Sequence, residues 1–160
     1  YNMSCLYRSL SHFHSKINTD QLRQILCNYL LTNPILGGMK AEDSIRYEAN
    51  MNMSLVQYVN RMRNNSEWGG AIEIKAYCDF FNRNVVVWSI PNRKNIEFVS
   101  DKSTNIVDKI YWTGTHYEPI SSYINDNTNN NTNNNNNTNN NNNTNNNNNN
   151  DIICTFRRVQ

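Results

Sequence analysis

Residues 85–98 read VVVWSIPNRKNIEF, and the periodicity of the chain changes at this stretch. VVVWSI at 85–90 is a continuous apolar run of mostly β-branched residues, which predicts a central strand buried on both faces. PNRKN predicts a turn, and the alternation of Ile96 and Phe98 with polar residues predicts a second strand. Two more strands are expected at KIYW, 109–112, and at HYEPI, 116–120, with the loop TGT between them.

Helical spacing dominates the residues before 85. CLYRSLSHF repeats apolar residues at helical intervals, so Cys5 is expected at or next to a helix N-terminus. Thr19 is expected to cap the next helix, DQLRQILCNYLLT at 20–32. A short, mostly exposed helix is expected over 41–49. A second short helix is expected after Ser54, which would be its N-cap, and a third from Gly70 to about residue 82. Helices followed by strands predict an α+β or layered α/β domain, with a small β-sheet flanked by helices.

The composition is that of a globular domain interrupted by one low-complexity tract. The chain has 160 residues, and positions 127–150 consist of 20 Asn and 4 Thr. Without the tract, the apolar share rises from 38% to about 45%, which is typical of a folded domain. The tract has nothing apolar to bury, so we expect it to be disordered and its removal to leave the fold intact. A prion-like, aggregation-prone module is the alternative.

One domain is expected from this length. Residues 1–126 would form it, 127–150 the disordered insert, and 151–160 a C-terminal segment. Within that segment, IICTF at 152–156 is either a returning last strand or an unrelated piece. Because the sequence opens on Tyr1 rather than Met, we expect it to belong to a longer protein.

Charge and hydropathy argue against several classes of partner. The 15 basic and 13 acidic residues are scattered and leave a net charge of +2, so no dominant nucleic-acid or anionic-membrane surface is indicated. No stretch approaches the roughly 18 apolar residues of a membrane span. The four cysteines (Cys5, Cys27, Cys78, Cys154) form no CxxC pair, and free thiols fit a reducing compartment, the cytoplasm or the nucleus.

Three segments carry the candidate chemistry: CLYRSL at 5–10, WGGAIEIKA at 68–76 and THYEPI at 115–120. A thiol at a helix N-terminus is favoured as thiolate by the helix dipole and by a nearby histidine, which makes Cys5 a candidate nucleophile. His116 follows a strand far away in the sequence and can meet the thiol in space. Its other ring nitrogen then needs an orienting acceptor.

These segments resemble, in order and spacing, the ovarian tumour (OTU) family of cysteine proteases, most of which are deubiquitinases. The resemblance spans about residues 1–124. The family's Cys-Leu-Phe/Tyr-Arg-Ser/Ala motif is similar to Cys5, Leu6, Tyr7, Arg8 and Ser9. Its Trp-Gly-Gly with a following helical glutamate is similar to Trp68, Gly69, Gly70 and Glu73, and its His-aromatic-polar motif to His116, Tyr117 and Glu118. The resemblance implies an OTU-like cysteine protease fold and no cofactor or metal. It also implies ubiquitin, polyubiquitin chains and ubiquitinated proteins as partners.

The resemblance further implies a thiol-dependent deubiquitinase. Cys5 would attack the carbonyl of the modifier's C-terminal glycine, and His116 would take the thiol proton and return it to the leaving lysine amine. Two residues are candidates for orienting the imidazole. Glu118 lies two positions further along the strand, hence on the same side, and Asn2 occupies the place of the family's aspartate. We favour Glu118, because a carboxylate also stabilises an imidazolium.

The loop before Cys5 departs from the family pattern, which usually reads Asp-Gly-Asn/Asp and here reads Asn2, Met3, Ser4. In the family, the backbone amides of this loop and of the cysteine form the oxyanion hole, and a glycine allows backbone angles that Met3 disfavours. The departure motivates an alternative, a catalytically inactive OTU-like ubiquitin-binding or scaffold module. A thiol protease or amidase with an unrelated substrate is a third interpretation.

Each site residue also has a structural interpretation. Cys5 can be a small buried side chain and His116 a polar residue at a strand edge. The Trp68, Gly69 and Gly70 segment can contact substrate or serve as an anchored helix entry, and the sequence leaves open whether Glu73 holds a loop or is solvated. A metal site built on Cys5, His12 and His14 is disfavoured, because the two histidines point to different sides of a helix and a fourth ligand is lacking.

Overall fold

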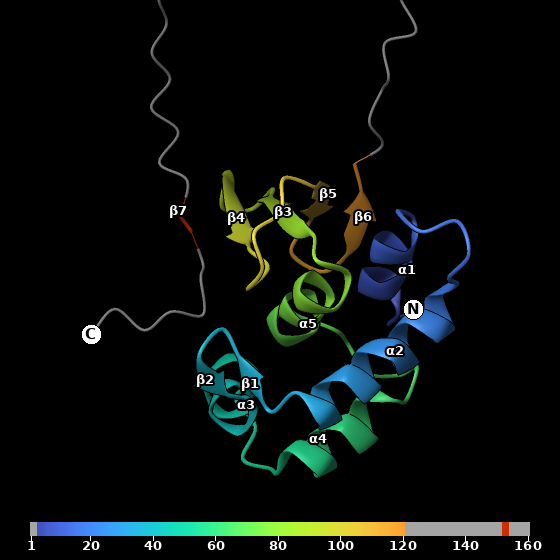
Figure 1. Ribbon diagram of the computed structural model, residues 1–160. Coiled ribbons are helices and arrows are strands. Elements are labelled where there is room, and N and C mark those ends of the chain that lie inside the picture. The colour runs from blue at the N-terminus through green and yellow to red at the C-terminus, as the bar shows by residue number, and fades with distance from the viewer. Residues whose placement is uncertain (1–2, 121–151, 154–160) are drawn as a thin grey trace, which may run out of the picture.

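The computed structural model describes residues 3–120 and the backbone of residues 152 and 153 (Figure 1). Helices come first and the main sheet follows. The helices are α1 (Cys5–Ser11), α2 (Thr19–Thr32), α3 (Ala41–Glu48), α4 (Leu55–Met62) and α5 (Ala71–Phe81). The strands of the main sheet are β3 (Asn84–Ser89), β4 (Lys94–Phe98), β5 (Val107–Trp112), β6 (Tyr117–Pro119) and β7 (Ile152–Ile153). Asn2, the Asn/Thr tract and Cys154 lie outside the described residues.

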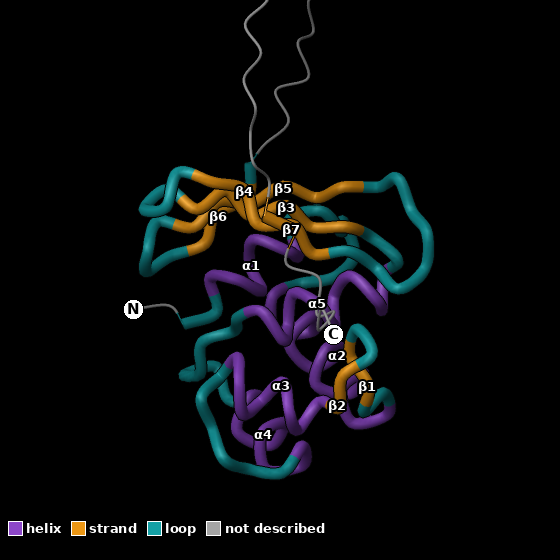
Figure 2. The backbone as a smooth tube through the Cα atoms, turned by 90° about the vertical axis from the view of Figure 1, so that its left-hand side faces the viewer, coloured by secondary structure: helices purple, strands orange, loops and turns teal. Residues whose placement is uncertain are grey.

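The molecule has two layers, which confirms the predicted layered α/β class. Figure 2 shows the sheet as one layer and the helices together on one side of it. The core lies between the layers and among the helices, and its fully buried members include Leu6, Leu10, Ile74, Tyr77 and Ile110. Among residues 3–120, no helix has the length and apolar character to cross a membrane.

The sheet has the strand order β6-β5-β3-β4-β7. β3 pairs antiparallel with β4 and parallel with β5, and β6 returns antiparallel along β5. The expectation that β3 is buried on both faces is wrong: Val85 and Val87 are buried, whereas Val86 is half-buried and Trp88 is 38% exposed. The physical reason is that the helices cover only one face of the sheet, so burial along the strand alternates.

Local capping sets the helix starts. α2 is capped by Asn18 rather than by Thr19, because the Asn18 Oδ1 atom accepts from the Gln21 amide at 2.9 Å and the Gln21 side chain accepts from the Asn18 amide. Ser54 caps α4 through the same reciprocal arrangement, as predicted. The prediction that the helix α3 is mostly exposed is only partly correct, since Ala41 and Ile45 are buried.

Two short pairings extend this plan. β1 (Ile35–Leu36) and β2 (Met39–Lys40) form a small antiparallel hairpin between α2 and α3. β7 pairs in parallel with β4, with Ile152 opposite Ile96. The rest of the segment expected at 152–156 lies outside the described residues.

Candidate active site

Cys5 is the first residue of α1, where the sequence predicts it. Its side chain is fully buried, and the helix is anchored in the core by Leu6, Tyr7 and Leu10, all 0% exposed. The Ser9 hydroxyl donates to the Cys5 carbonyl at 2.8 Å. The start of α1 is therefore held in place by the packing of the residues that follow the thiol.

His116 immediately precedes β6 on the edge of the sheet. The turn from β5 fixes its backbone: the His116 amide donates to Thr113 Oγ1 at 3.1 Å, and the Thr113 amide donates to the His116 carbonyl at 2.9 Å. Gly114 in this turn has φ +107°, a conformation that favours glycine. Tyr117, on the other side of β6, packs against the core.

His116 and Glu118 lie on one side of β6 and are in contact. His116 Nε2 is 2.5 Å from Glu118 Oε1, and the two side chains are 36% and 33% exposed. A contact this short between a ring nitrogen and a carboxylate requires a proton on Nε2. In the neutral imidazole, the unprotonated nitrogen that can accept a proton is then Nδ1.

Arg8, from the helix of Cys5, completes this cluster. Its Nη2 atom donates to Glu118 Oε1 at 2.8 Å and lies 3.2 Å from His116 Nε2. Since Nε2 carries the proton that faces Glu118, the approach of Arg8 to that nitrogen is a close contact rather than a hydrogen bond. From the sequence alone, Arg8 is only a position in the Cys5 motif, because its partners lie more than 100 residues away.

Helix α1 packs against β6 and so brings the Cys5 segment to the His116 segment (Figure 1). Burial, and next an electrostatic interaction with Cys5, raise the pKa of Tyr117 to about 12. Within residues 3–120, no hydrogen bond joins Cys5 Sγ to His116. Asn2, the other candidate for orienting the imidazole, lies outside the described residues.

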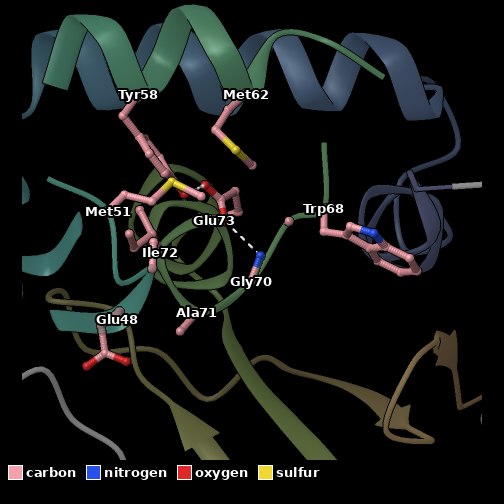
Figure 3. A pocket seen from close by; sticks show the side chains of 11 residues that line it. Glu48, Met51, Tyr58, Met62, Trp68, Gly70, Ala71, Ile72 and Glu73 are labelled. Carbon is pink, nitrogen blue, oxygen red and sulfur yellow. Dashed lines mark hydrogen bonds between the residues drawn. The ribbon is translucent and has the colours of Figure 1, made fainter. Parts of the chain in front are cut away.

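Trp68, Gly69 and Gly70 lead into α5, and Gly69 lies against α1. A Cβ atom on Gly69 would come within 2.8 Å of Leu6 Cδ2 and 3.0 Å of Tyr7 Cε2, so only glycine allows this approach. The Trp68 side chain is 44% exposed and, in Figure 3, points away from Glu73. The segment thus has an architectural role at Gly69, and substrate contact by these three residues stays a prediction.

Glu73, left open between two roles, is buried and holds the loop. Its Oε2 atom accepts from the Gly70 amide at 2.7 Å and its Oε1 atom from the Tyr58 hydroxyl at 2.5 Å (Figure 3). Burial raises the pKa of Glu73, against hydrogen bonds from Tyr58 and Gly70 that lower it. The three residues belong to the lining of a pocket of about 180 Å³ that opens beside Trp68.

The other described cysteines are poor nucleophiles. Cys27 and Cys78 are buried, and burial raises the pKa of the first to about 11 and of the second to about 12. Cys5, His12 and His14 do not form a metal site, since no group of three potential ligands gathers anywhere in residues 3–120.

The chain matches the sequence model of a known protein family. A model described as "OTU-like cysteine protease" matches residues 4–117, which include Cys5 and His116.

Two of the similar proteins have different names, and one of these names contains the OTU domain. The chain is 24% identical over 121 residues to UDP-N-acetylglucosamine transferase subunit ALG13 of Mus musculus, covering 74% of this chain and 10% of that protein. It is 27% identical over 122 residues to OVARIAN TUMOR DOMAIN-containing deubiquitinating enzyme 9 of Arabidopsis thaliana, covering 73% of this chain and 32% of that protein. The chain therefore spans less than half the length of these relatives.

Among solved structures, the fold is similar to that of an ovarian tumour (OTU) domain in complex with ubiquitin. The TM-score is 0.58 and the sequence identity 25%, and the match covers 74% of this chain and 63% of that one.

Proposed function

Because the chain belongs to the family of OTU-like cysteine proteases, we propose that it is a thiol-dependent deubiquitinase. Its substrate would be the isopeptide bond between a lysine and the C-terminal glycine of ubiquitin or a ubiquitin-like modifier. The observation that carries the proposal is the contact of His116 Nε2 with Glu118 on β6, at the strand against which the helix of Cys5 packs. The names of the similar Arabidopsis protein and of the ubiquitin-bound structure support the choice of modifier.

In the proposed reaction, Glu118 keeps the proton of the imidazole on Nε2, so Nδ1 is the base. Nδ1 takes the proton of the Cys5 thiol as sulfur attacks the glycine carbonyl carbon. The C–N bond of the tetrahedral intermediate then breaks, the imidazolium returns the proton to the lysine amine, and a thioester remains. Water, deprotonated by the same nitrogen, hydrolyses the thioester and regenerates the thiol. Glu118 stabilises the imidazolium that forms in both halves.

A second candidate function is a catalytically silent module that binds ubiquitin. One observation favours it: Cys5 is fully buried and, in the described residues, makes no hydrogen bond to His116. The altered loop of Asn2, Met3 and Ser4 points the same way. A thiol protease or amidase for another substrate remains the third.

A ubiquitin probe with an electrophile at its C-terminus separates the three. The parent chain is expected to gain the mass of one probe, and Cys5→Ala is expected to gain none while retaining its circular dichroism spectrum. Binding of unmodified ubiquitin without covalent capture would support the silent module instead. Capture by a small thiol reagent alone, with no affinity for ubiquitin, would point to a different substrate.

A further inference from the structure

Arg23 of α2 is a buried cation at the centre of the helical layer. Its side chain is 0% exposed, and its guanidinium lies over the ring of Tyr7, with Cζ 4.0 Å from the ring centroid. Tyr7 is two residues after Cys5 on α1. The cation is thus in contact with the helix that carries the proposed nucleophile.

The guanidinium joins three separate segments of the chain. Nη1 donates to the carbonyl of Met62, at the end of α4, at 2.8 Å. Nη2 donates both to the hydroxyl of Ser4 and to the carbonyl of Glu67, each at 3.0 Å. Ser4 directly precedes Cys5, and Glu67 directly precedes Trp68. One nitrogen atom therefore ties the loop before the nucleophile to the entry of α5.

This arrangement is unfavourable as a device for stability alone. A buried cation loses its hydration and regains only part of it from neutral acceptors and from a carboxylate at longer range, here the buried Glu73, whose pKa burial raises and the charge of Arg23 partly lowers. Among residues 3–120, no carboxylate forms an ion pair with Arg23, and its Nε atom has no hydrogen-bond partner. A buried apolar side chain would avoid the cost of desolvating the guanidinium. The hydrogen bonds that Arg23 makes therefore indicate a role other than stability.

The Ser4 side chain supplies that explanation. Ser4 occupies the N-cap position of α1, where a serine hydroxyl usually accepts from an amide of the first turn. Here Ser4 makes no such capping bond and accepts from Arg23 instead. The hydroxyl of the residue before Cys5 is consequently held by the buried Arg23 of α2, while its carbonyl accepts from the Arg8 amide of its own helix at 2.9 Å.

Resting on the proposed function, we propose that Arg23 is a positioning residue for the reaction of Cys5. Through Ser4 and Glu67 it holds the loop before the thiol at a set place relative to α5, in a chain whose loop lacks the glycine of the family pattern. Among residues 3–120, no hydrogen bond or ion pair joins Arg23 to the Cys5 thiol or to His116. Its effect is on the geometry in which the tetrahedral intermediate forms, so it acts on kcat and much less on ubiquitin affinity.

The test compares Arg23→Met with Arg63→Met, using a fluorogenic ubiquitin C-terminal amide. Arg63 also links the end of α4 to α2, donating to Gln24 and Asn28 at 2.7 Å, but does not reach Ser4. Arg23→Met is expected to lower kcat at least tenfold with KM within threefold of the parent. Arg63→Met is expected to leave kcat within twofold, even if it lowers the melting temperature. Ser4→Ala, which keeps Arg23 and removes the hydroxyl that accepts from it, is expected to lower kcat about threefold or more.

Five outcomes decide between the proposal and its alternatives. A kcat loss confined to Arg23→Met and Ser4→Ala supports the proposal. If Arg23→Met does not fold, the loss in Ser4→Ala against unchanged Arg63→Met supports it, and unchanged kcat in Ser4→Ala overturns it. Equal kcat losses in Arg23→Met and Arg63→Met overturn it in favour of a general structural role. A parent chain that shows neither turnover nor probe capture overturns the proposed function itself and the role of Arg23 with it.

Discussion

Arg8 and Glu118 form an ion pair between α1 and β6, with Nη2 2.8 Å from Oε1. The same oxygen is the partner of His116 Nε2, so a single carboxylate oxygen serves both a cation of the nucleophile's helix and the imidazole. The pair crosses from the helical layer to the sheet edge. It links the two halves of the proposed site without involving the thiol.

Glu118→Gln tests whether the carboxylate orients and charges the imidazole. The amide can still accept a hydrogen bond from Nε2 but brings no negative charge to stabilise an imidazolium. We expect kcat to fall about 10- to 1000-fold with nearly unchanged KM. Steady-state kinetics on di-ubiquitin measures both. Parental activity in Glu118→Gln together with a large loss in Asn2→Ala would assign the orienting role to Asn2.

Arg8 is expected to act through Glu118. Arg8 and Glu118 are 47% and 33% exposed, and an ion pair of this kind contributes at most about 1 kcal/mol, so Arg8→Gln alone should lower kcat no more than about fivefold. In the Glu118→Gln background, the same substitution should have no further effect. A double-mutant cycle in kcat measures the coupling. Additive losses would mean that Arg8 acts independently of Glu118.

Cys27→Ala and Cys78→Ala are expected to keep a substantial fraction of turnover, whereas Cys5→Ala keeps none. Burial raises the pKa of Cys27 to about 11 and that of Cys78 to about 12, so both are neutral thiols at pH 7. Initial rates of di-ubiquitin cleavage, corrected for the folded fraction, provide the comparison. Residual cleavage by Cys5→Ala would exclude the proposed mechanism.

Gly69→Ala is expected to separate α1 from the entry of α5. The added methyl would meet Leu6 and Tyr7, both 0% exposed, and overpacking of this kind costs about 1–3 kcal/mol. Gly70→Ala is the matched control, because a Cβ atom there meets nothing within 4 Å. Urea denaturation of the two variants measures the difference in unfolding free energy. Equal unfolding free energies for Gly69→Ala and Gly70→Ala would show that α1 can move away from the added methyl group without loss of stability.

Glu73→Gln is expected to change the pH dependence of stability. Because burial raises the pKa of Glu73 in the folded chain above its ordinary value of 4.5, the native state holds this proton more tightly than the unfolded state does. The resulting stability is present below pH 4.5 and is lost as the pH rises through the raised value.

Glutamine does not ionise, so Glu73→Gln should gain stability relative to the parent as the pH rises from 4.5 to 8. Urea denaturation at both pH values tests this. Glu48→Gln, at an exposed position on the rim of the same pocket, is the control. A constant difference between Glu73→Gln and the parent would contradict the expectation.

The sequence predicts those features that depend on neighbours along the chain. The two-residue repeat of a strand is enough to place His116 and Glu118 on one side, and Ser54 with Gln57 is enough to start α4. At α2 two good capping residues adjoin, and the choice of Asn18 follows from Gln21 three positions later. The three-residue spacing of Asn18 and Gln21 in the sequence is therefore a sufficient signal for the start of α2.

The remaining features depend on contacts between distant segments. VVVWSI reads the same whether one or two faces are covered, so the exposure of Trp88 follows only from the position of the helices. The carbonyls of Met62 and Glu67 that accept from Arg23 carry no side-chain signal at all. The position of Arg23, between Leu22 and Leu26 on the buried face of α2, was the one available sign.

The thiol and the imidazole belong to different layers, joined at this site by the packing of α1 on β6 and by the Arg8 pair. Among residues 3–120, no backbone hydrogen bond of the sheet and no helix spans that junction. A small slide of one layer over the other therefore changes the distance between sulfur and nitrogen while the described strands and helices stay intact. The turnover rate is therefore sensitive to the relative position of the two layers. Under rising urea, it should decline before circular dichroism detects any loss of secondary structure.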